Sequence, residues 1–265
     1  MTLVQIIVLA LIQGLTEFLP VSSSAHLILG SKAFAWTDQG LIFDVATHLG
    51  TRFAVLIYFR KDLCSMARSW LEPVRGKEDR MNRNLTVYLA IASIPAVSVG
   101  FVAHDLVELY LRDVRIIAWA TIGFGLLLWV ADATGKHVRA IEDMTLGRAL
   151  IIGLAQILAL IPGASRSGVT MTAGRFLGFG PEAAARFSFL LSIPVVAAAG
   201  GFGIFVIASG QAVINWTQFL LALLFSALAG WVCIAAFLAL LNRVGLLPFI
   251  IYRLLLGVTL LWVVH

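Results

Sequence analysis

Residues 13–26 read Gln13-Gly-Leu-Thr-Glu-Phe-Leu-Pro-Val-Ser-Ser-Ser-Ala-His26 and form a polar, proline-broken stretch inside an otherwise apolar region. The carboxylate of Glu17, three serine hydroxyls and the imidazole of His26 fall within ten residues. Ionisable groups at membrane depth cost about 2.5–3.5 kcal/mol each on insertion scales, and they usually mark function. The stretch therefore decides two things at once: a break in a membrane-embedded helix, and a polar site at that break.

A second stretch, Pro162-Gly-Ala-Ser-Arg-Ser-Gly168, interrupts another apolar region and adds the guanidinium of Arg166. Together the two stretches supply an acid, hydroxyls, a histidine and an arginine. This set of groups in a membrane indicates chemistry on a phosphate, since arginine binds phosphate through two parallel hydrogen bonds.

The composition is that of a polytopic membrane protein. Of the 265 residues, 60% are hydrophobic and 12% are charged, whereas a soluble chain has about 45–50% and 25%. The basic residues cluster in two loops and form no basic, aromatic-rich soluble face, so no nucleic-acid partner is expected. Cys64 and Cys233 lie far apart, fit no metal spacing and are expected to be unpaired thiols. The chain starts without the basic region and cleavage site of a signal peptide, so the first apolar segment is expected to be retained.

The predicted fold class is all-α, with six transmembrane helices, because about 20 residues cross the hydrocarbon core. The six apolar runs lie near 41–59, 85–103, 114–131, 186–208, 216–241 and 246–264. Regions 3–34 and 147–178 are apolar but broken, and we expect each to form a re-entrant helix-turn-helix hairpin, since irregular backbone at this depth must be buried or line a wet cavity. Residues 1–265 then form one integral membrane domain.

The charged loops predict how the chain is oriented. The region from Arg60 to Asn84 holds seven Lys/Arg, and the region from Asp132 to Arg148 holds three more, at Lys136, Arg139 and Arg148. Two spans separate these loops, so they share one side, which the positive-inside rule makes cytoplasmic. The His104–Asp113 connection is then expected to face outward, and Thr145 is expected to cap the second hairpin.

The order of segments also predicts an inverted-topology repeat, with halves at approximately 1–131 and 142–265. Pro20-Val-Ser-Ser-Ser aligns with Pro162-Gly-Ala-Ser-Arg at an offset of 142, and Gln13 and Gln156 match one residue out of phase. Each half reads hairpin, span, span, span. Three spans are an odd number, so the second half enters from the opposite side, and a site is expected near the midplane between the halves.

The spacing within the first stretch suggests roles, and some alternatives stay open. Gln13 and Glu17 share one helix face and are candidates to hold Mg²⁺ or Ca²⁺, although a hydrogen bond to a neighbouring helix and an ion pair with an arginine explain them equally well. The serines have N-cap composition, and a cap is the expected role of Ser22. His26 follows Ser23 by three residues, which fits a hydroxyl nucleophile with a histidine base.

Other polar residues in the spans are expected to be structural. We interpret His48 and His104 as structural or interfacial because neither has such neighbours. Asp44 and Arg52 share the face of His48 and are candidates to support the site from behind, but a structural polar face is the favoured interpretation. Arg186, Ser188 and Glu182 are interpreted likewise.

The two polar stretches closely resemble the motifs of the bacterial undecaprenyl-diphosphate phosphatase family, also called the bacitracin-resistance phosphatases. That family carries Glu/Gln-x-x-x-Glu followed by Pro-Val-Ser-Ser-x-x-His, and later Pro-Gly-x-Ser-Arg-Ser-Gly. These are residues 13–26 and 162–168 here, with the Gln option at position 13. Asp-Met-Thr at 143–145 and Arg-Phe-Ser-Phe-Leu-Leu at 186–191 match as well, so the likeness extends over essentially the whole chain.

The resemblance implies hydrolysis of undecaprenyl diphosphate to the monophosphate and inorganic phosphate, which recycles the lipid carrier for peptidoglycan synthesis. It implies a divalent cation, Mg²⁺ or Ca²⁺, a multi-pass location in the bacterial inner membrane and a pocket that opens towards the outer face. The expected partners are a polyprenyl diphosphate lipid and membrane lipids, with a homodimer as an option. The implied site comprises catalytic Glu17, Ser23, His26 and Arg166, phosphate contacts at Ser24, Ser165, Arg166 and Ser167, and metal ligands at Gln13 and Glu17.

The motifs leave the nucleophile open. We favour Ser23, with His26 as its base or as proton donor to the leaving group. Attack by His26, or by a water that Glu17 activates, is the alternative. A polyprenyl-phosphate flippase is the competing function, because inverted repeats recur in transporters, but a flippase has no use for a base beside a hydroxyl. Ser165-Arg166 also resembles the Ser-Arg pair of a second lipid-phosphatase superfamily, related to type-2 phosphatidic acid phosphatases. That superfamily requires a histidine six residues after the arginine, where Thr172 stands here, so this likeness is superficial.

Overall fold

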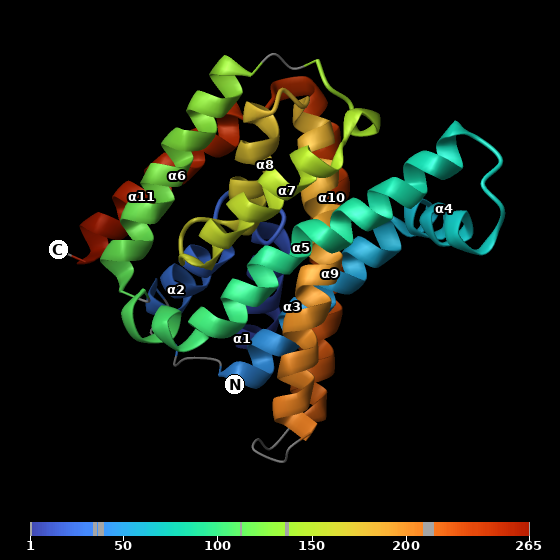
Figure 1. Ribbon diagram of the computed structural model, residues 1–265. Helices are drawn as coiled ribbons and strands as arrows, with labels where there is room; N and C mark the ends of the chain where they lie inside the picture. The colour runs from blue at the N-terminus through green and yellow to red at the C-terminus, as the bar shows by residue number, and fades with distance from the viewer. Residues whose placement is uncertain are drawn as a thin grey trace.

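The computed structural model describes residues 2–33, 36, 40–111, 113–135, 138–208 and 215–264. In this part of the chain the fold is helical, with no named strand and one isolated bridge between Arg139 and Phe179. The helices, labelled in Figure 1, are α1 (Leu3–Thr16), α2 (Ser23–Ala33), α3 (Leu41–Tyr58), α4 (Arg60–Leu71), α5 (Lys77–Tyr110), α6 (Val114–Thr134), η1 (Ile141–Asp143), α7 (Leu146–Ala155), η2 (Gln156–Leu160), α8 (Arg166–Phe176), α9 (Pro181–Ala208), α10 (Trp216–Val244) and α11 (Leu247–Val264).

Among the residues that the structure describes, three helices are long and apolar enough to cross a membrane, namely residues 77–103 of α5, α6, and α10. A fourth span is obtained if α3 and α4 count as one, bent by 72°. All six runs predicted as spans are helical where the structure describes them. The protein is therefore an all-α membrane protein.

Two expected loops are largely helical instead. The region from Arg60 to Asn84 contains α4 and the start of α5, and α5 continues to Tyr110 through most of the predicted outward connection. These segments are helical because Arg, Lys and Glu favour helix despite their charge, as does the apolar Met. Helix α4 also buries Met66. In Figure 1, α4 and the first turns of α5 project from the rest of the bundle. Lys136, from the second basic loop, lies outside the described residues.

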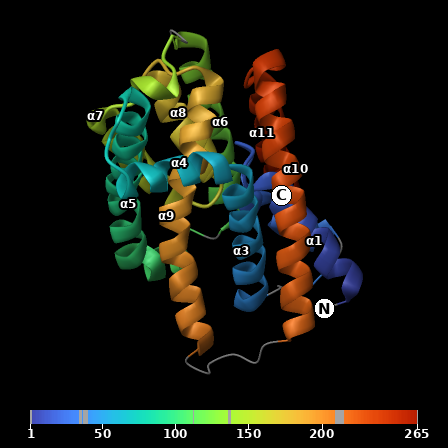
Figure 2. The same cartoon turned by 90° about the vertical axis from the view of Figure 1, so that its right-hand side faces the viewer.

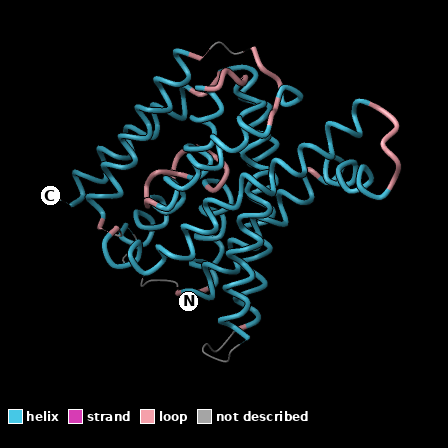
Figure 3. Tube along the Cα trace, in the orientation of Figure 1, coloured by secondary structure: helices cyan, strands magenta, loops and turns pink. Residues whose placement is uncertain are grey.

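Both broken regions consist of short helices joined by a turn. In the first, α1 and α2 flank residues 17–22, and in the second, α7 with η2 and α8 flank residues 161–165. Figure 3 shows the second of these turns as loop inside the helical bundle. The Thr145 hydroxyl caps α7 by accepting from the Arg148 amide, as its place in the sequence predicts.

The helices of the two predicted halves pack in corresponding pairs. Helix α3 packs against α10 as α9 packs against α5, and α1 packs against α10 as α7 packs against α5. The pairs α3 with α9 and α6 with α11, whose members occupy equivalent places in the two predicted halves, also pack together. Figure 2 shows α3, α9 and α10 running side by side, with α4 crossing in front of α9 in this view. This arrangement carries the two polar turns into the interior.

Glycines permit the close approach of each hairpin to its long helix. A Cβ at Gly14 of α1 would lie 2.6 Å from the Ala229 Cβ of α10, and a Cβ at Gly153 of α7 would lie 2.2 Å from the Ala92 carbonyl oxygen of α5. Small residues at such contacts are typical of helices that pack within membranes, where van der Waals contact drives association. The depth of both hairpins in the bundle therefore depends on these two positions.

Candidate active site

The two polar turns meet inside the protein. The Ser167 hydroxyl, at the start of α8, donates to the Leu19 carbonyl of the first turn at 2.9 Å. Ser167 is fully buried. The contact joins residues 148 positions apart in the chain, so the fold brings together the two stretches that the sequence analysis singled out.

The guanidinium of Arg253, in α11, binds both turns. Its side chain is fully buried and donates to the carbonyls of Gly163 at 2.8 Å and Pro20 at 3.3 Å, as well as to Ala164 and Thr121. Among the described residues no carboxylate pairs with it, so backbone carbonyls provide the compensation that a buried charge requires. The sequence analysis did not identify Arg253, although a lone arginine within an apolar run was the signal available.

Glu17, the first residue of the first turn, is the centre of a hydrogen-bonded cluster. The Ser23 hydroxyl donates to Glu17 Oε2 at 3.0 Å, and the Gln13 side-chain amide donates to the same oxygen at 3.0 Å. An Arg166 Nη2 lies 3.6 Å from Glu17 Oε1. The structure thus assembles three of the predicted site residues around the carboxylate of a fourth, and both side chains of the ion pair are less than 15% exposed.

Helix α3 adds two groups that the sequence analysis interpreted as structural. The Gln13 amide nitrogen lies 3.2 Å from His48 Nδ1, and Arg52, one helical turn later, interacts electrostatically with Glu17. His48 therefore belongs to the cluster, which corrects its interpretation as structural or interfacial, and Arg52 takes the supporting place that was its alternative. Their i, i+4 spacing on an apolar span was the signal that pointed to a shared polar face.

Arg166 is oriented by α9. Its Nη1 donates to the Ser188 carbonyl at 3.2 Å, while the Ser188 hydroxyl lies 2.7 Å from the Thr170 hydroxyl one turn further along α8. Ser188, which was also interpreted as structural, therefore holds the arginine from behind. The other terminal nitrogen, Nη2, lies on the Glu17 side.

His26 does not pair with Ser23, contrary to the prediction from their spacing. His26 Nδ1 lies 2.7 Å from the Ser22 carbonyl, and Nε2 lies 2.7 Å from the Tyr252 hydroxyl. The ring is therefore bonded at both nitrogens, and in the described structure the Ser23 hydroxyl is directed to Glu17 instead. The helix places Ser23 and His26 near each other, but the Ser22 carbonyl is the closer acceptor for the ring.

The remaining predicted phosphate contacts take local roles. The Ser24 hydroxyl lies 3.1 Å from the Ser22 hydroxyl, and the Ser165 hydroxyl lies 3.1 Å from that of Ser167 while it accepts from the Gly168 amide. Ser165 thus caps α8. The Ser167 proton is committed to the Leu19 carbonyl, so this buried residue links the turns and is not an open contact for a ligand.

The geometry aligns the two turns one residue away from the proline alignment. Ser22 and Ser165 are the non-glycine residues with positive φ in the described chain, at 69° and 65°. Each is followed two residues later by the serine whose hydroxyl it contacts. In this register Gln13 falls on Gln156, and Ser23 falls on Arg166. The two turns therefore have one backbone design with different side chains at the same place.

The polar atoms of the cluster show whether its residues fit a divalent cation. Gln13 Oε1 is buried and has no hydrogen-bond partner, since the amide nitrogen serves both Glu17 and His48. The described residues contain no group of three or more His, Cys, Asp or Glu side chains that would hold a metal alone. One free amide oxygen beside one carboxylate fits an ion such as Mg²⁺, which usually takes one or two protein ligands together with substrate phosphates.

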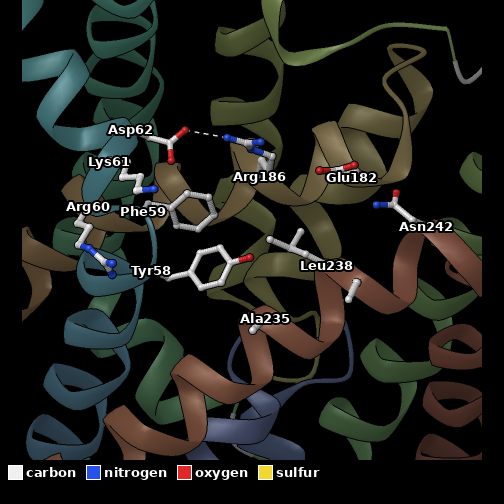
Figure 4. A pocket seen from close by; sticks show the side chains of 11 residues that line it. Tyr58, Phe59, Arg60, Lys61, Asp62, Glu182, Arg186, Ala235, Leu238 and Asn242 are labelled. Atoms are coloured by element: carbon white, nitrogen blue, oxygen red, sulfur yellow. Dashed lines mark hydrogen bonds and ion pairs between the residues drawn. The ribbon is translucent and has the colours of Figure 1, made fainter.

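Two of the cavities in the described part of the chain lie beside α3, away from these turns. An apolar groove of about 190 Å³ runs between α3 and α9 beside Arg52. A larger polar cavity of about 520 Å³ lies at the bend between α3 and α4, where Asp62 and Arg186 form an ion pair at 2.7 Å. Figure 4 shows this pair at the rim, with Glu182 and Asn242 beside it. It contains none of the predicted site residues.

Comparison with known proteins identifies the family. The family described as Bacitracin resistance protein BacA matches residues 6–259. The chain belongs to the BacA family. The match includes both polar turns and Arg253.

Relatives in this family are similar over their full length. Undecaprenyl-diphosphatase 1 of Pseudoalteromonas translucida is 51% identical over 261 residues, 98% of each chain. Undecaprenyl-diphosphatase of Alteromonas mediterranea is 49% identical over 264 residues, 100% of this chain and 99% of the relative. Undecaprenyl-diphosphatase of Chromohalobacter salexigens is 51% identical over 260 residues, 97% and 98% of the two chains.

Proposed function

We propose that this protein hydrolyses undecaprenyl diphosphate to undecaprenyl phosphate and inorganic phosphate. The names of its full-length relatives support the substrate. The observation that carries the chemistry is the cluster in which the Ser23 hydroxyl and the Arg166 guanidinium both contact Glu17. A hydroxyl, a carboxylate acceptor and an arginine in one buried place are the groups that phosphoryl transfer requires.

In the proposed reaction Ser23 Oγ attacks the terminal phosphorus and Glu17 accepts the serine proton. The bond between that phosphorus and the bridging oxygen breaks, and its electron pair leaves with undecaprenyl phosphate. Water then hydrolyses the phosphoserine and releases inorganic phosphate. Arg166 transfers its contact from Glu17 to the terminal phosphate, where a bidentate guanidinium stabilises the negative charge of the transition state.

His26 has a different role in this scheme from the one that its spacing suggests. Its ring contacts the Ser22 carbonyl and Tyr252, and so it reaches Ser23 only through the backbone of the turn. Ser165 and Ser24 lie beside the two turns with half-buried hydroxyls, where they can contact the diphosphate once it is bound. Ser167 contributes by holding the turns together.

We also propose that Mg²⁺ or Ca²⁺ arrives with the diphosphate and is held by Glu17 and Gln13 Oε1. The ion would offset the charge of the phosphate oxygens. Arg52 and His48 lie on the α3 side of the cluster, and the apolar groove beside Arg52 fits part of a prenyl chain. A long apolar tail beside a polar head site matches an amphiphilic substrate.

The proposed architecture is an inverted-topology repeat with halves 1–131 and 142–265, each made of one re-entrant hairpin and three spans in the bacterial inner membrane. The matching helix pairs and the shared geometry of the two turns support it. The positive-inside rule favours a cytoplasmic location for the basic α4 region. We propose that the active site at the two polar turns opens towards the outer face.

Cys64, which is exposed on α4, offers a direct test of this orientation, because Cys233 is buried. A membrane-impermeant maleimide should label Cys64 only after the cells are opened. An Arg115→Cys variant on a Cys64→Ser background should be labelled in intact cells. Labelling of Cys64 from outside would reverse the orientation.

The function itself is tested by phosphate release from purified protein and a C55 prenyl diphosphate. We expect stoichiometric inorganic phosphate and prenyl monophosphate in the presence of Mg²⁺ or Ca²⁺. The matched control is Glu182→Gln, which removes a carboxylate outside the cluster. Absence of phosphate release from folded wild-type protein would refute the proposal.

A further inference from the structure

The contact between Tyr252 and His26 joins α11 to the start of α2. The Tyr252 hydroxyl lies 2.7 Å from His26 Nε2, and the two rings are nearly parallel, with an interplanar angle of 13° and a centroid distance of 5.6 Å. Tyr252 is 47% exposed, so its hydroxyl does not need a protein partner to compensate for burial. The pairing instead fixes one ring against the other by hydrogen bond and stacking.

We propose that Tyr252 is a positioning residue of the active site, which acts through His26 on the turn that presents Ser23. The proposal rests on the proposed function in taking Ser23 as the reacting group. No substrate contact is assigned to Tyr252 itself.

The hydrogen bonds determine which nitrogen of His26 carries the proton. A carbonyl oxygen only accepts, so the contact of Nδ1 with the Ser22 carbonyl requires the proton on Nδ1. In the neutral ring Nε2 is then the acceptor, and the Tyr252 hydroxyl donates to it. The Ser22 carbonyl thus selects the tautomer, and the Tyr252 hydroxyl, by donating to Nε2, reinforces that tautomer and fixes the orientation of the His26 ring.

The carbonyl that His26 holds belongs to a strained residue. Ser22 has φ of 69°, in the left-handed region that costs a non-glycine residue free energy. Such conformations persist when the surroundings determine them, and they occur often at active sites. The His26 backbone amide and its ring both contact the Ser22 carbonyl. His26 therefore stabilises the turn that directs the next residue, Ser23, towards Glu17.

Helix α11 is a firm support for this contact. Arg253, the neighbour of Tyr252, is bound to carbonyls of both turns. The second turn has no equivalent support from a histidine, because Val169 follows Arg166 by the same three residues that separate His26 from Ser23. The tyrosine–histidine pair is thus specific to the turn that carries the hydroxyl.

The test combines kinetics with a spectroscopic measurement on Tyr252→Phe, which keeps the ring and removes the hydroxyl. We expect kcat to fall about tenfold, the size expected for the loss of one hydrogen bond, with KM within about twofold of wild type. Tyr110→Phe, at an exposed tyrosine, is the matched control and should keep wild-type kcat.

The ¹⁵N chemical shifts of the His26 ring, assigned with His26→Gln, report the contact without any need for activity. Wild type should show a neutral ring with the proton on Nδ1, and Tyr252→Phe should shift Nε2 or mix the tautomers. Unchanged kcat together with unchanged ¹⁵N shifts would overturn the proposal. Unchanged shifts with lower kcat would also overturn it, because Tyr252 would then act independently of His26. If wild type hydrolyses no diphosphate, the proposed function fails, while the shifts still decide the contact.

Discussion

The first and second polar turns share a backbone but differ in the groups that they present. Each begins with a serine at positive φ, Ser22 or Ser165, and each contains a pair of contacting hydroxyls. Where the first turn offers the Ser23 hydroxyl, the second offers the Arg166 guanidinium. Two copies of one turn, packed together, thus place a nucleophile and a cation on opposite sides of one carboxylate.

The preceding helices show the same difference. In the register of the two serines, Glu17 falls on Leu160 and Gln13 falls on Gln156. Gln13 is bonded to Glu17 and His48, whereas both polar atoms of Gln156 are buried without a partner. The comparison teaches that the first hairpin carries the acid and the hydroxyl, and the second mainly supplies charge and support.

The largest effect is expected when the carboxylate at the centre of the cluster is removed. Glu17→Gln keeps the shape but can no longer accept the Ser23 proton or pair with Arg166. We expect kcat/KM to fall at least about 10³-fold, at the upper end of what a positioned base contributes. Steady-state phosphate release measures it, and Glu182→Gln is the control. Activity within tenfold of wild type would assign the base elsewhere.

A smaller loss is expected when the cation of the second turn loses its shape but keeps its charge. Arg166→Lys cannot make two parallel hydrogen bonds to phosphate. We expect kcat to fall about 10²-fold, the scale of removing one donor to a developing charge, with an unchanged melting temperature. Arg186→Lys, which alters the ion pair with Asp62, should retain activity. Near-wild-type turnover of Arg166→Lys would contradict the clamp.

The joint between the turns is tested by adding one methyl group. A Cβ at Gly168 would lie 2.4 Å from an Arg253 guanidinium nitrogen, which is pinned by backbone carbonyls. We expect Gly168→Ala to destabilise the protein by about 1–3 kcal/mol, as overpacking does, and to lower activity about tenfold. Gly147→Ala meets no atom within 4 Å and is the control. Equal melting temperatures for the two variants would refute the tight joint.

The two glutamines provide the subtlest test of the comparison. Gln13→Leu should lower activity severalfold and weaken the dependence on divalent cation, because it removes the free oxygen beside Glu17. Gln156→Leu should keep activity and raise the free energy of unfolding by about 1 kcal/mol, since it replaces an unpaired buried amide by an apolar group. Cation titrations and thermal melts measure both. Loss of activity in Gln156→Leu would show that the second hairpin has chemistry of its own.

Much of the fold followed from the hydropathy pattern and from the prolines and glycines that interrupt it. Pro20 and the Pro162-Gly pair break apolar runs, so the two breaks between short helices were predictable, as were the helices of the six runs. Helix α4 was not, because its charged residues resemble a loop when only hydropathy is considered. Its helical propensity and one buried face outweigh that polarity.

The site was predictable as a set of residues but not as a set of contacts. The costly polar groups at 13–26 and 162–168 identified themselves. His48, Arg253 and Tyr252 reach the turns from other helices, and no spacing along the chain reveals which face of those helices points inward. The Ser23–His26 pair failed as a prediction because a backbone carbonyl, which no sequence pattern reports, competes for the ring.

The central claim is that Ser23, held towards Glu17, attacks phosphorus. It is tested most directly by trapping the enzyme with a C55 prenyl diphosphate labelled in its terminal phosphate, and by mapping the modified residue by mass spectrometry. We expect a phosphoserine at Ser23 that is absent in Ser23→Ala and present in Ser24→Ala. Phosphate on His26, or substantial turnover of Ser23→Ala with no modified residue, would contradict it.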